Sequence, residues 1–135
     1  MVVSPGSGTT ALYDNGLSGT TFSTPLSYTL LLPTPTAGGS TTWDTAGADG
    51  QIGFSRSAFV AGEVTTINGT AVSGPGAPDS NSDWDGNSSL PLPQLWDNEG
   101  HDIQASTPSG TTELDVTIGA SGDCLTTVEN VVTEH

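Results

Sequence analysis

Residues 64–72, Val-Thr-Thr-Ile-Asn-Gly-Thr-Ala-Val, contain the clearest local signal in the chain. Asn68 and Gly69 tolerate the positive φ angles of a type I′ turn, and β-branched residues flank them on both sides. The segment therefore predicts a tight antiparallel hairpin. A second turn is predicted at Asp14-Asn15-Gly16, which contains the same Asn-Gly pair.

Segments on either side of this hairpin have the alternating pattern of half-buried strands. In residues 24–32 the even positions from 26 to 32 are Leu, Tyr, Leu and Leu, and a proline follows directly. In residues 113–118 the even positions are Leu, Val and Ile, whereas the odd positions are Glu, Asp and Thr. Residues 51–60 and 123–133 are predicted strands as well. No segment has helical spacing of its apolar residues, because Gly, Pro or Thr interrupts every window.

These patterns predict one all-β domain spanning residues 1–135. Turn signals recur about every 8–12 residues, which is typical of an antiparallel β-sandwich or jelly roll. A chain of this length can bury a core without the support of a metal or a disulfide. We expect an N-terminal arm at 1–10, a short flexible connector that could also act as an arm at 33–41, and one long acidic loop at 73–93.

The chain has 15 acidic residues, one arginine and no lysine, for a formal net charge of −14. This composition argues against nucleic-acid partners, because almost nothing in it neutralises phosphates, and an anionic membrane surface would repel the protein. No apolar stretch approaches the length of about 18 residues that spans a bilayer, which argues against membrane insertion. A salt-adapted, halophilic exterior and a genome that avoids lysine codons both explain the missing lysine.

The most specific motif lies in the long loop, where oxygen-bearing side chains occupy alternate positions around Gly86. Such side chains can converge on one ion, and calcium takes six to eight oxygen ligands at about 2.3–2.6 Å. The pattern Asn-x-Asp-x-Asp-Gly resembles the start of EF-hand, dockerin and thrombospondin-type calcium loops, but its twelfth position is Leu92 instead of a bidentate Glu. The sequence predicts calcium as the cofactor, or else a solvated acidic turn. The predicted ligands are Asp79, Asn81, Asp83, Asp85 and Asn87.

The three tryptophans, Trp43, Trp84 and Trp96, are each followed by an aspartate. A tryptophan next to a carboxylate can stack on a sugar ring and accept hydrogen bonds from its hydroxyl groups. Trp84, Trp96 and Asp97 are therefore the candidate ligand-binding residues of a carbohydrate-binding module. Tryptophans also fill cores, and core packing is the competing interpretation in a chain with so few aromatic residues.

Catalytic signals are weak, and we expect no enzyme. His101 could pair with Asp97 or Asp102, but no Gly-x-Ser-x-Gly elbow supplies a nucleophile. Carboxylate pairs are too numerous in this chain to indicate a glycosidase. The single cysteine, Cys124, allows no intrachain disulfide and is expected to be a small buried side chain, and Arg56 is expected to pair with an acid.

Three segments in the C-terminal part of the chain resemble a known class of proteins. They are Leu90-Pro-Leu-Pro-Gln-Leu-Trp-Asp, His101-Asp-Ile and Gly122-Asp-Cys-Leu-Thr-Thr-Val-Glu-Asn-Val-Val. Together they resemble the C-terminal half of β-sandwich domains in secreted, Thr/Gly-rich bacterial surface proteins. The resemblance implies an extracellular and non-enzymatic role.

The sequence thus predicts a non-enzymatic exterior structural protein. It would be a capsid decoration or other virion surface protein, or a subunit of an extracellular appendage or surface layer. Its partners would be copies of itself or a larger virion or surface scaffold, joined through an apolar patch or an edge strand. Its location would be extracellular or on the virion surface. The alternative function is a calcium-stabilised carbohydrate-binding or adhesion module.

Overall fold

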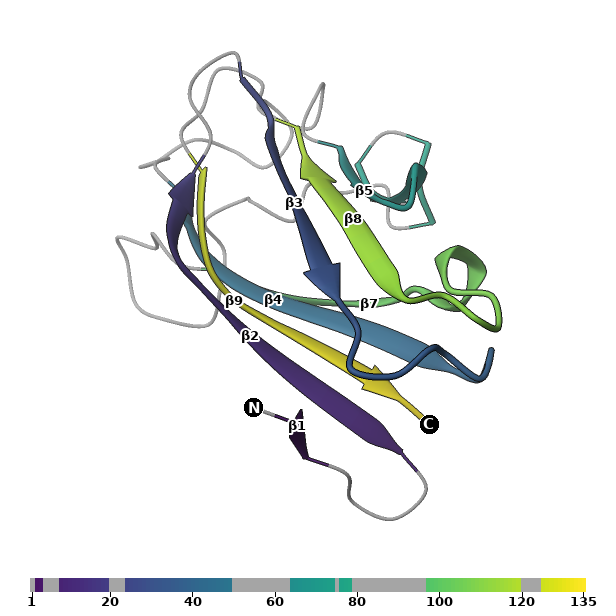
Figure 1. Ribbon diagram of the computed structural model, residues 1–135. Helices are drawn as coiled ribbons and strands as arrows, with labels where there is room; N and C mark the ends of the chain where they lie inside the picture. The colour runs from purple at the N-terminus through teal and green to yellow at the C-terminus, as the bar shows by residue number, and fades with distance from the viewer. Residues whose placement is uncertain are drawn as a thin grey trace.

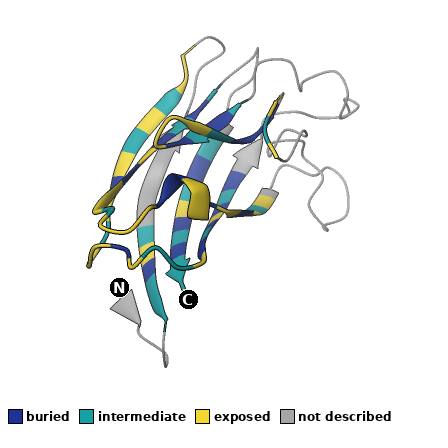
Figure 2. Ribbon diagram, turned by 90° about the vertical axis from the view of Figure 1, so that its right-hand side faces the viewer, coloured by how far each residue is buried: buried dark blue, intermediate teal, exposed yellow. Residues whose placement is uncertain are grey.

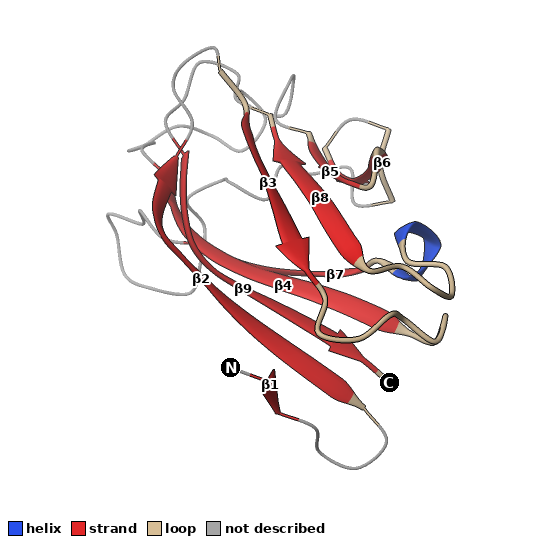
Figure 3. Ribbon diagram, in the orientation of Figure 1, coloured by secondary structure: helices blue, strands red, loops and turns tan. Residues whose placement is uncertain are grey.

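The computed structural model of the chain describes residues 2–3, 8–19, 24–49, 64–74, 76–78, 97–119 and 125–135. Apart from one turn of 3₁₀ helix, Gln104–Ser106, the regular elements of these residues are strands (Figure 3). They form two antiparallel sheets packed face to face as a β-sandwich (Figure 1). The five-stranded sheet has the order β1 (Val2–Val3), β2 (Thr9–Gly19), β9 (Leu125–Glu134), β4 (Thr41–Asp49) and β7 (Asp97–Asp102). The four-stranded sheet has the order β3 (Leu26–Leu31), β8 (Glu113–Ile118), β5 (Thr65–Ile67) and β6 (Thr70–Ser73).

The strand pairing is that of a jelly roll, a long hairpin that has been rolled up. The innermost pair is β5 with β6, and β4 with β7, β3 with β8 and β2 with β9 follow outward. Successive pairs fall in alternate sheets, and the pairings of β4 with β9 and of β5 with β8 complete the two sheets. The predicted fold class is therefore confirmed as a β-sandwich with jelly-roll topology.

The hairpin predicted at residues 64–72 is the β5–β6 pair. Asn68 has φ 51° and Gly69 has φ 77°, so both central residues adopt the positive φ that a type I′ turn requires. The Asn68 side chain also ties this turn to its neighbours. Its Nδ2 donates to the Ser106 carbonyl at 2.9 Å, and its Oδ1 accepts from the Asp115 backbone N–H at 2.8 Å.

The alternating patterns predicted at 24–32 and 113–118 are confirmed as β3 and β8. Their even-numbered side chains point between the sheets, and buried residues alternate with exposed ones along the strands (Figure 2). The core lies between the two sheets at one continuous cluster. Its buried members are Leu30, Trp43, Ile67, Val72, Ile103, Leu114, Val116, Ile118 and Val132.

The turn predicted at Asp14-Asn15-Gly16 is wrong, because these residues lie inside β2. The pairing with β9 shifts there: from Asp14 to Ser18 strand β2 advances four residues while β9 advances two, from Glu129 to Thr127. Asn and Gly accommodate the irregular backbone of such a bulge as readily as that of a turn. The sequence signal was therefore real, but it marks an interruption of the ladder and not the end of a strand.

The connector predicted at 33–41 is tied down on both sides, so the expectation of a free, flexible arm there is wrong. The buried Thr36 exchanges hydrogen bonds with residues 108–111 through both its backbone and its hydroxyl group. Glu134 Oε1 accepts the backbone N–H groups of Ala37 and Gly38 at 2.7 and 3.2 Å. We call residues 33–40 the strap.

Of the remaining strands and segments, some were predicted correctly, some were not predicted, and some lie outside the described residues. The strand predicted at 123–133 is β9, whereas β4 and β7 were not predicted. Within the expected arm at 1–10, Val2 and Val3 pair with Ala11 and Thr10 of β2. The strand predicted at 51–60 lies outside the described residues, as does most of the predicted loop at 73–93.

Candidate interaction surface

The residues predicted to bind calcium or sugar fall mostly outside the described part of the chain. This applies to Trp84, Trp96 and all five predicted calcium ligands, and also to Cys124 and Arg56. Asp97 is described only as the first residue of β7. The described residues contain no group of three or more His, Cys, Asp or Glu side chains that could hold a metal ion. The calcium and carbohydrate sites therefore remain predictions.

Trp43 and His101 are core residues, which explains two of the side chains that the sequence offered for chemistry. Trp43 is fully buried and stacks on the His101 ring, with ring centroids 5.9 Å apart. Its indole N–H donates to Asn130 Oδ1 at 2.8 Å, and the Tyr28 hydroxyl donates to the same oxygen at 2.8 Å. Asp102, the proposed partner of His101, accepts the backbone N–H of Gln104. These contacts give Trp43 and His101 a structural role.

The charged residues are distributed very unevenly along the chain. Of the 15 acidic residues, only Asp14 lies within residues 1–43, and Arg56 lies beyond them too. The described part of residues 1–43 contains β1, β2, β3, the strap and the first three residues of β4. Strands β2 and β3 are neighbours on the same side of the sandwich, where purple and dark blue mark them in Figure 1, and Tyr13 of β2 donates to the Leu31 carbonyl of β3 at 2.7 Å. This side, which we call the neutral edge, contrasts with the strongly acidic chain as a whole.

Both exposed large hydrophobic side chains of the described residues flank the neutral edge. Leu31 is 68% exposed on the outer face of β3, and Leu12 is 37% exposed on the outer face of β2. Tyr13 follows Leu12 in β2 and bonds to the Leu31 carbonyl, and burial raises the pKa of its hydroxyl group above the ordinary value of 10.0. An exposed leucine on an edge strand that has no charged residue of its own is a feature of surfaces that other proteins cover.

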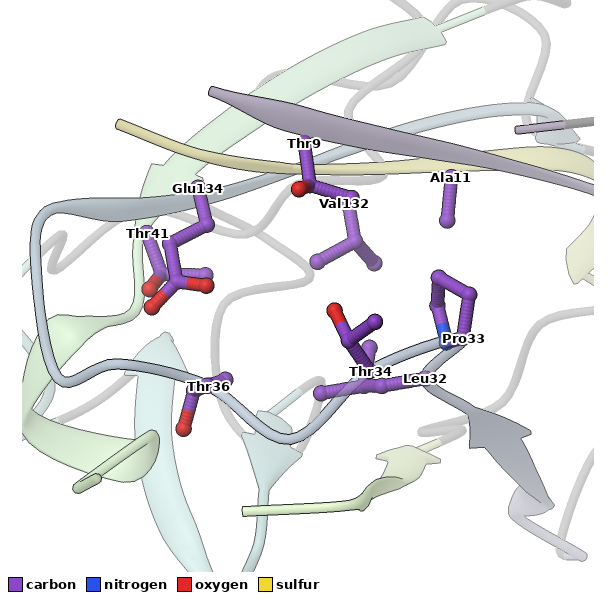
Figure 4. Close-up of a pocket in the computed structure, with 9 residues that line it drawn as sticks. All are labelled: Thr9, Ala11, Leu32, Pro33, Thr34, Thr36, Thr41, Val132 and Glu134. Atoms are coloured by element: carbon purple, nitrogen blue, oxygen red, sulfur yellow. The ribbon is translucent and has the colours of Figure 1, made fainter. Parts of the chain in front are cut away.

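A small pocket lies where the neutral edge meets the strap. In Figure 4, Ala11 of β2 and Val132 of β9 face Leu32, Pro33 and Thr34 across the gap between sheet and strap. The pocket offers about 20 Å³ to a water molecule, which is room for one. It is therefore too small for a sugar or a cofactor. Its complete lining is Thr9, Ala11, Leu32, Pro33, Thr34, Thr36, Thr41, Val132 and Glu134.

A larger and shallower hollow lies on the outer face of the five-stranded sheet, away from the neutral edge. Its volume is about 350 Å³, and carboxylates of Asp44, Glu99 and Glu129 contribute to its lining. The Asp44 carboxylate lies over Gly100, where an added Cβ would be 2.5 Å from Oδ1. The hollow thus combines a small residue with like charges, and a second copy of this acidic chain would be repelled from it.

No protein-family model, curated protein or solved structure matches the chain. The resemblance to secreted bacterial surface proteins therefore stays an expectation. In the described residues, no helix is long and apolar enough to cross a membrane.

The neutral edge was missed by the sequence reasoning, although a signal for it exists. The net charge was considered for the whole chain, whereas its position along the chain holds the information. Only one of the 15 acidic residues lies within residues 1–43. Only the topology shows that this segment becomes one side of the molecule, because β2 and β3 belong to different sheets.

Proposed function

We propose that the protein is a non-enzymatic structural subunit of an exterior assembly, such as a virion surface or capsid decoration, an extracellular appendage or a surface layer. The observation that carries this proposal is the neutral edge with its exposed Leu31 in a chain of net charge −14. Like-charged subunits repel one another, so contact between them requires a surface that lacks the charge. The neutral edge meets that requirement.

The fold supports the proposal by analogy only. Jelly rolls occur in viral capsid proteins, but also in lectins and cupins, so the architecture is compatible with several functions. The outward faces of the sheets favour a role in a hydrated exterior. Hydroxyl and carboxylate groups pair across neighbouring strands there, as in Ser27 with Thr117 at 3.0 Å and Thr29 with Asp115 at 2.7 Å. Such pairs stabilise a sheet without presenting apolar surface.

The proposal is tested by sedimentation velocity and negative-stain electron microscopy of the purified chain over a range of salt concentrations. Salt at about 1 M reduces the Debye length to about 3 Å and removes most of the repulsion between acidic subunits. We expect oligomers and larger regular particles to increase with salt. Parallel samples in calcium and in EDTA separate an effect of the predicted loop from an effect of ionic strength. A chain that stays monomeric in every condition would contradict self-assembly.

A further inference from the structure

We infer that strand β3 is an interface strand and that it pairs, antiparallel, with β3 of a second copy of this chain. The inference rests on the proposed function and specifies its partner. A two-fold axis at Thr29 would join the four-stranded sheets of two copies into one continuous eight-stranded sheet. The argument depends on the hydrogen-bonding direction of β3, on its lack of charge and on the exposed Leu31.

Within the described part of the chain, one side of the β3 backbone pairs with no other strand. Leu32 N–H donates to the Thr112 carbonyl at 2.9 Å, and the register continues through Leu30 opposite Leu114, so even-numbered residues bond to β8. The backbone groups of Ser27, Thr29 and Leu31 therefore point away from β8, and no strand of the described residues pairs with that side. A second antiparallel strand could form hydrogen bonds with the backbone groups of these three residues, because every second residue bonds in such a ladder.

The charges, prolines and bulges that protect many edge strands are missing from β3 itself. Natural edges are shielded by charged side chains, prolines or bulges, whereas Leu26–Leu31 contains no charge and no proline and pairs with β8 without a register shift. Tyr13 occupies one lone pair of the Leu31 carbonyl oxygen at 2.7 Å. A carbonyl oxygen has a second lone pair, so it can still accept the N–H of the partner's Ser27.

Electrostatic repulsion at this contact comes from few charges, and salt screens it. The nearest acidic side chains on the same sheet are Glu113 and Asp115 of β8, and the Asp115 carboxylate accepts the Thr29 hydroxyl group at 2.7 Å. In the dimer the two β8 backbones would be separated by three strand spacings, or about 14 Å, and the two Asp115 carboxylates by less, because each leans toward the axis at Thr29. The pairing should therefore strengthen as added salt shortens the Debye length below its value of about 10 Å at 0.1 M. A second copy docked on the acidic hollow of the other sheet would meet much closer charges.

The proposed register makes a specific prediction about cross-linking. With the axis at Thr29, this residue lies opposite its own copy at a Cα separation of about 5.5 Å, which a disulfide can bridge. Ser27 lies opposite the partner's Leu31 instead, far from the partner's Ser27. In a Cys124→Ser background, we expect Thr29→Cys to give a disulfide-linked dimer under mild oxidation, whereas Ser27→Cys stays monomeric on a non-reducing gel.

A charge placed on the edge provides the second test. Leu31→Glu adds a negative charge to the contact, and Thr70→Glu adds the same charge on β6, at the opposite edge of the same sheet. In sedimentation velocity we expect Leu31→Glu to weaken the dimer by about tenfold or more, about 1.4 kcal/mol or more, and Thr70→Glu to leave it nearly unchanged. Circular dichroism melting curves establish that both variants are folded.

The outcomes separate this inference from the proposed function. Equal cross-linking of Thr29→Cys and Ser27→Cys, no cross-linking of either, or equal effects of the two glutamates would overturn β3 pairing. Large particles that form unchanged in Leu31→Glu would overturn β3 pairing but leave the structural role intact. A dimer linked through Thr29→Cys that never grows at any salt concentration would support β3 pairing and contradict a subunit that builds larger assemblies.

Discussion

The indole N–H of Trp43 donates a 2.8 Å hydrogen bond to Oδ1 of Asn130, and both side chains are completely buried. The Tyr28 hydroxyl donates to the same oxygen, so one amide group of the five-stranded sheet is bonded to a side chain of the four-stranded sheet. Since the indole N–H can only donate, the atom facing it must be the amide oxygen. The Asn130 Nδ2 then points elsewhere in the core, where it has no hydrogen-bond partner among the described residues.

Replacing Asn130 by leucine should strongly destabilise the fold. The variant keeps the branched shape of the side chain but leaves the indole N–H of Trp43 buried without an acceptor, and we expect the free energy of unfolding to fall by about 2–4 kcal/mol. Tyr28→Phe removes only one of the two bonds to this oxygen and should cost about 1 kcal/mol. Urea unfolding measures both. Equal stability of Asn130→Leu and the wild type would show that this polar centre contributes nothing.

The strap depends on the hydroxyl group of Thr36. That hydroxyl donates to the Pro108 carbonyl at 2.7 Å and accepts the Thr111 N–H at 3.1 Å. Thr36→Val preserves the shape and removes both bonds, but the Pro108 carbonyl still accepts the backbone N–H and the hydroxyl group of Thr111, so we expect a loss of about 1 kcal/mol in urea unfolding. Thr34→Val, at an exposed position of the same strap, is the matched control and should change stability by less than about 0.5 kcal/mol.

The β5–β6 turn allows backbone strain to be separated from side-chain bonding. A Cβ added at Gly69 would meet no atom within 4 Å, so any loss in Gly69→Ala comes from the φ of +77° and should be about 1 kcal/mol. Asn68→Gly permits the positive φ but removes the bonds with Ser106 and Asp115, and we expect it to cost about 1–2 kcal/mol. Thermal melting compares the two. An unchanged melting temperature in Gly69→Ala would exclude the strained turn.

Local sequence patterns predicted the elements whose own residues favour the structure that they adopt. β3, β8 and the hairpin at 64–72 combine alternation or turn chemistry with high β propensity, so their structure could be predicted without knowledge of their neighbours. β4 and β7 could not. The β7 sequence, Asp-Asn-Glu-Gly-His-Asp, contains residues that strands disfavour, and it is extended because it pairs along β4.

The candidate interface escaped prediction for a related reason. Residues 1–43, in which Asp14 is the only charged side chain, are spread over two sheets, and nothing in the local pattern says that β2 and β3 become neighbours. Trp43 illustrates the same limit. Its position before an aspartate suggested a sugar contact, whereas pairing with β9 and β7 places its ring in the core. Pairing between distant strands decides where such side chains lie, and local patterns in a single sequence do not reveal that pairing.

The acidic loop at 79–87 still predicts a calcium effect that stability measurements can detect. Calcium that binds only the folded chain should raise the melting temperature, by an amount equivalent to about 2.7 kcal/mol at 100 times its Kd. The double variant Asp83→Asn, Asp85→Asn should abolish the response because it removes two charged ligands. Glu113→Gln, an exposed acid on β8, is the control for general charge effects. Equal calcium responses in both variants would indicate screening and no specific site.

The hydroxyl group of Tyr13 links stability to alkaline pH. Burial raises its pKa in the folded state above 10.0, so the folded protein holds this proton more tightly than the unfolded chain does. The stabilisation is complete below pH 10 and is lost as pH rises toward the raised value, because the unfolded chain ionises first. At neutral pH, Tyr13→Phe should cost about 0.5–1.5 kcal/mol through the lost bond to Leu31. Urea midpoints of wild type and variant should therefore converge as the pH rises above the unfolded-state value of about 10. A gap that stays constant during this rise would mean that the Tyr13 pKa is the same in both states.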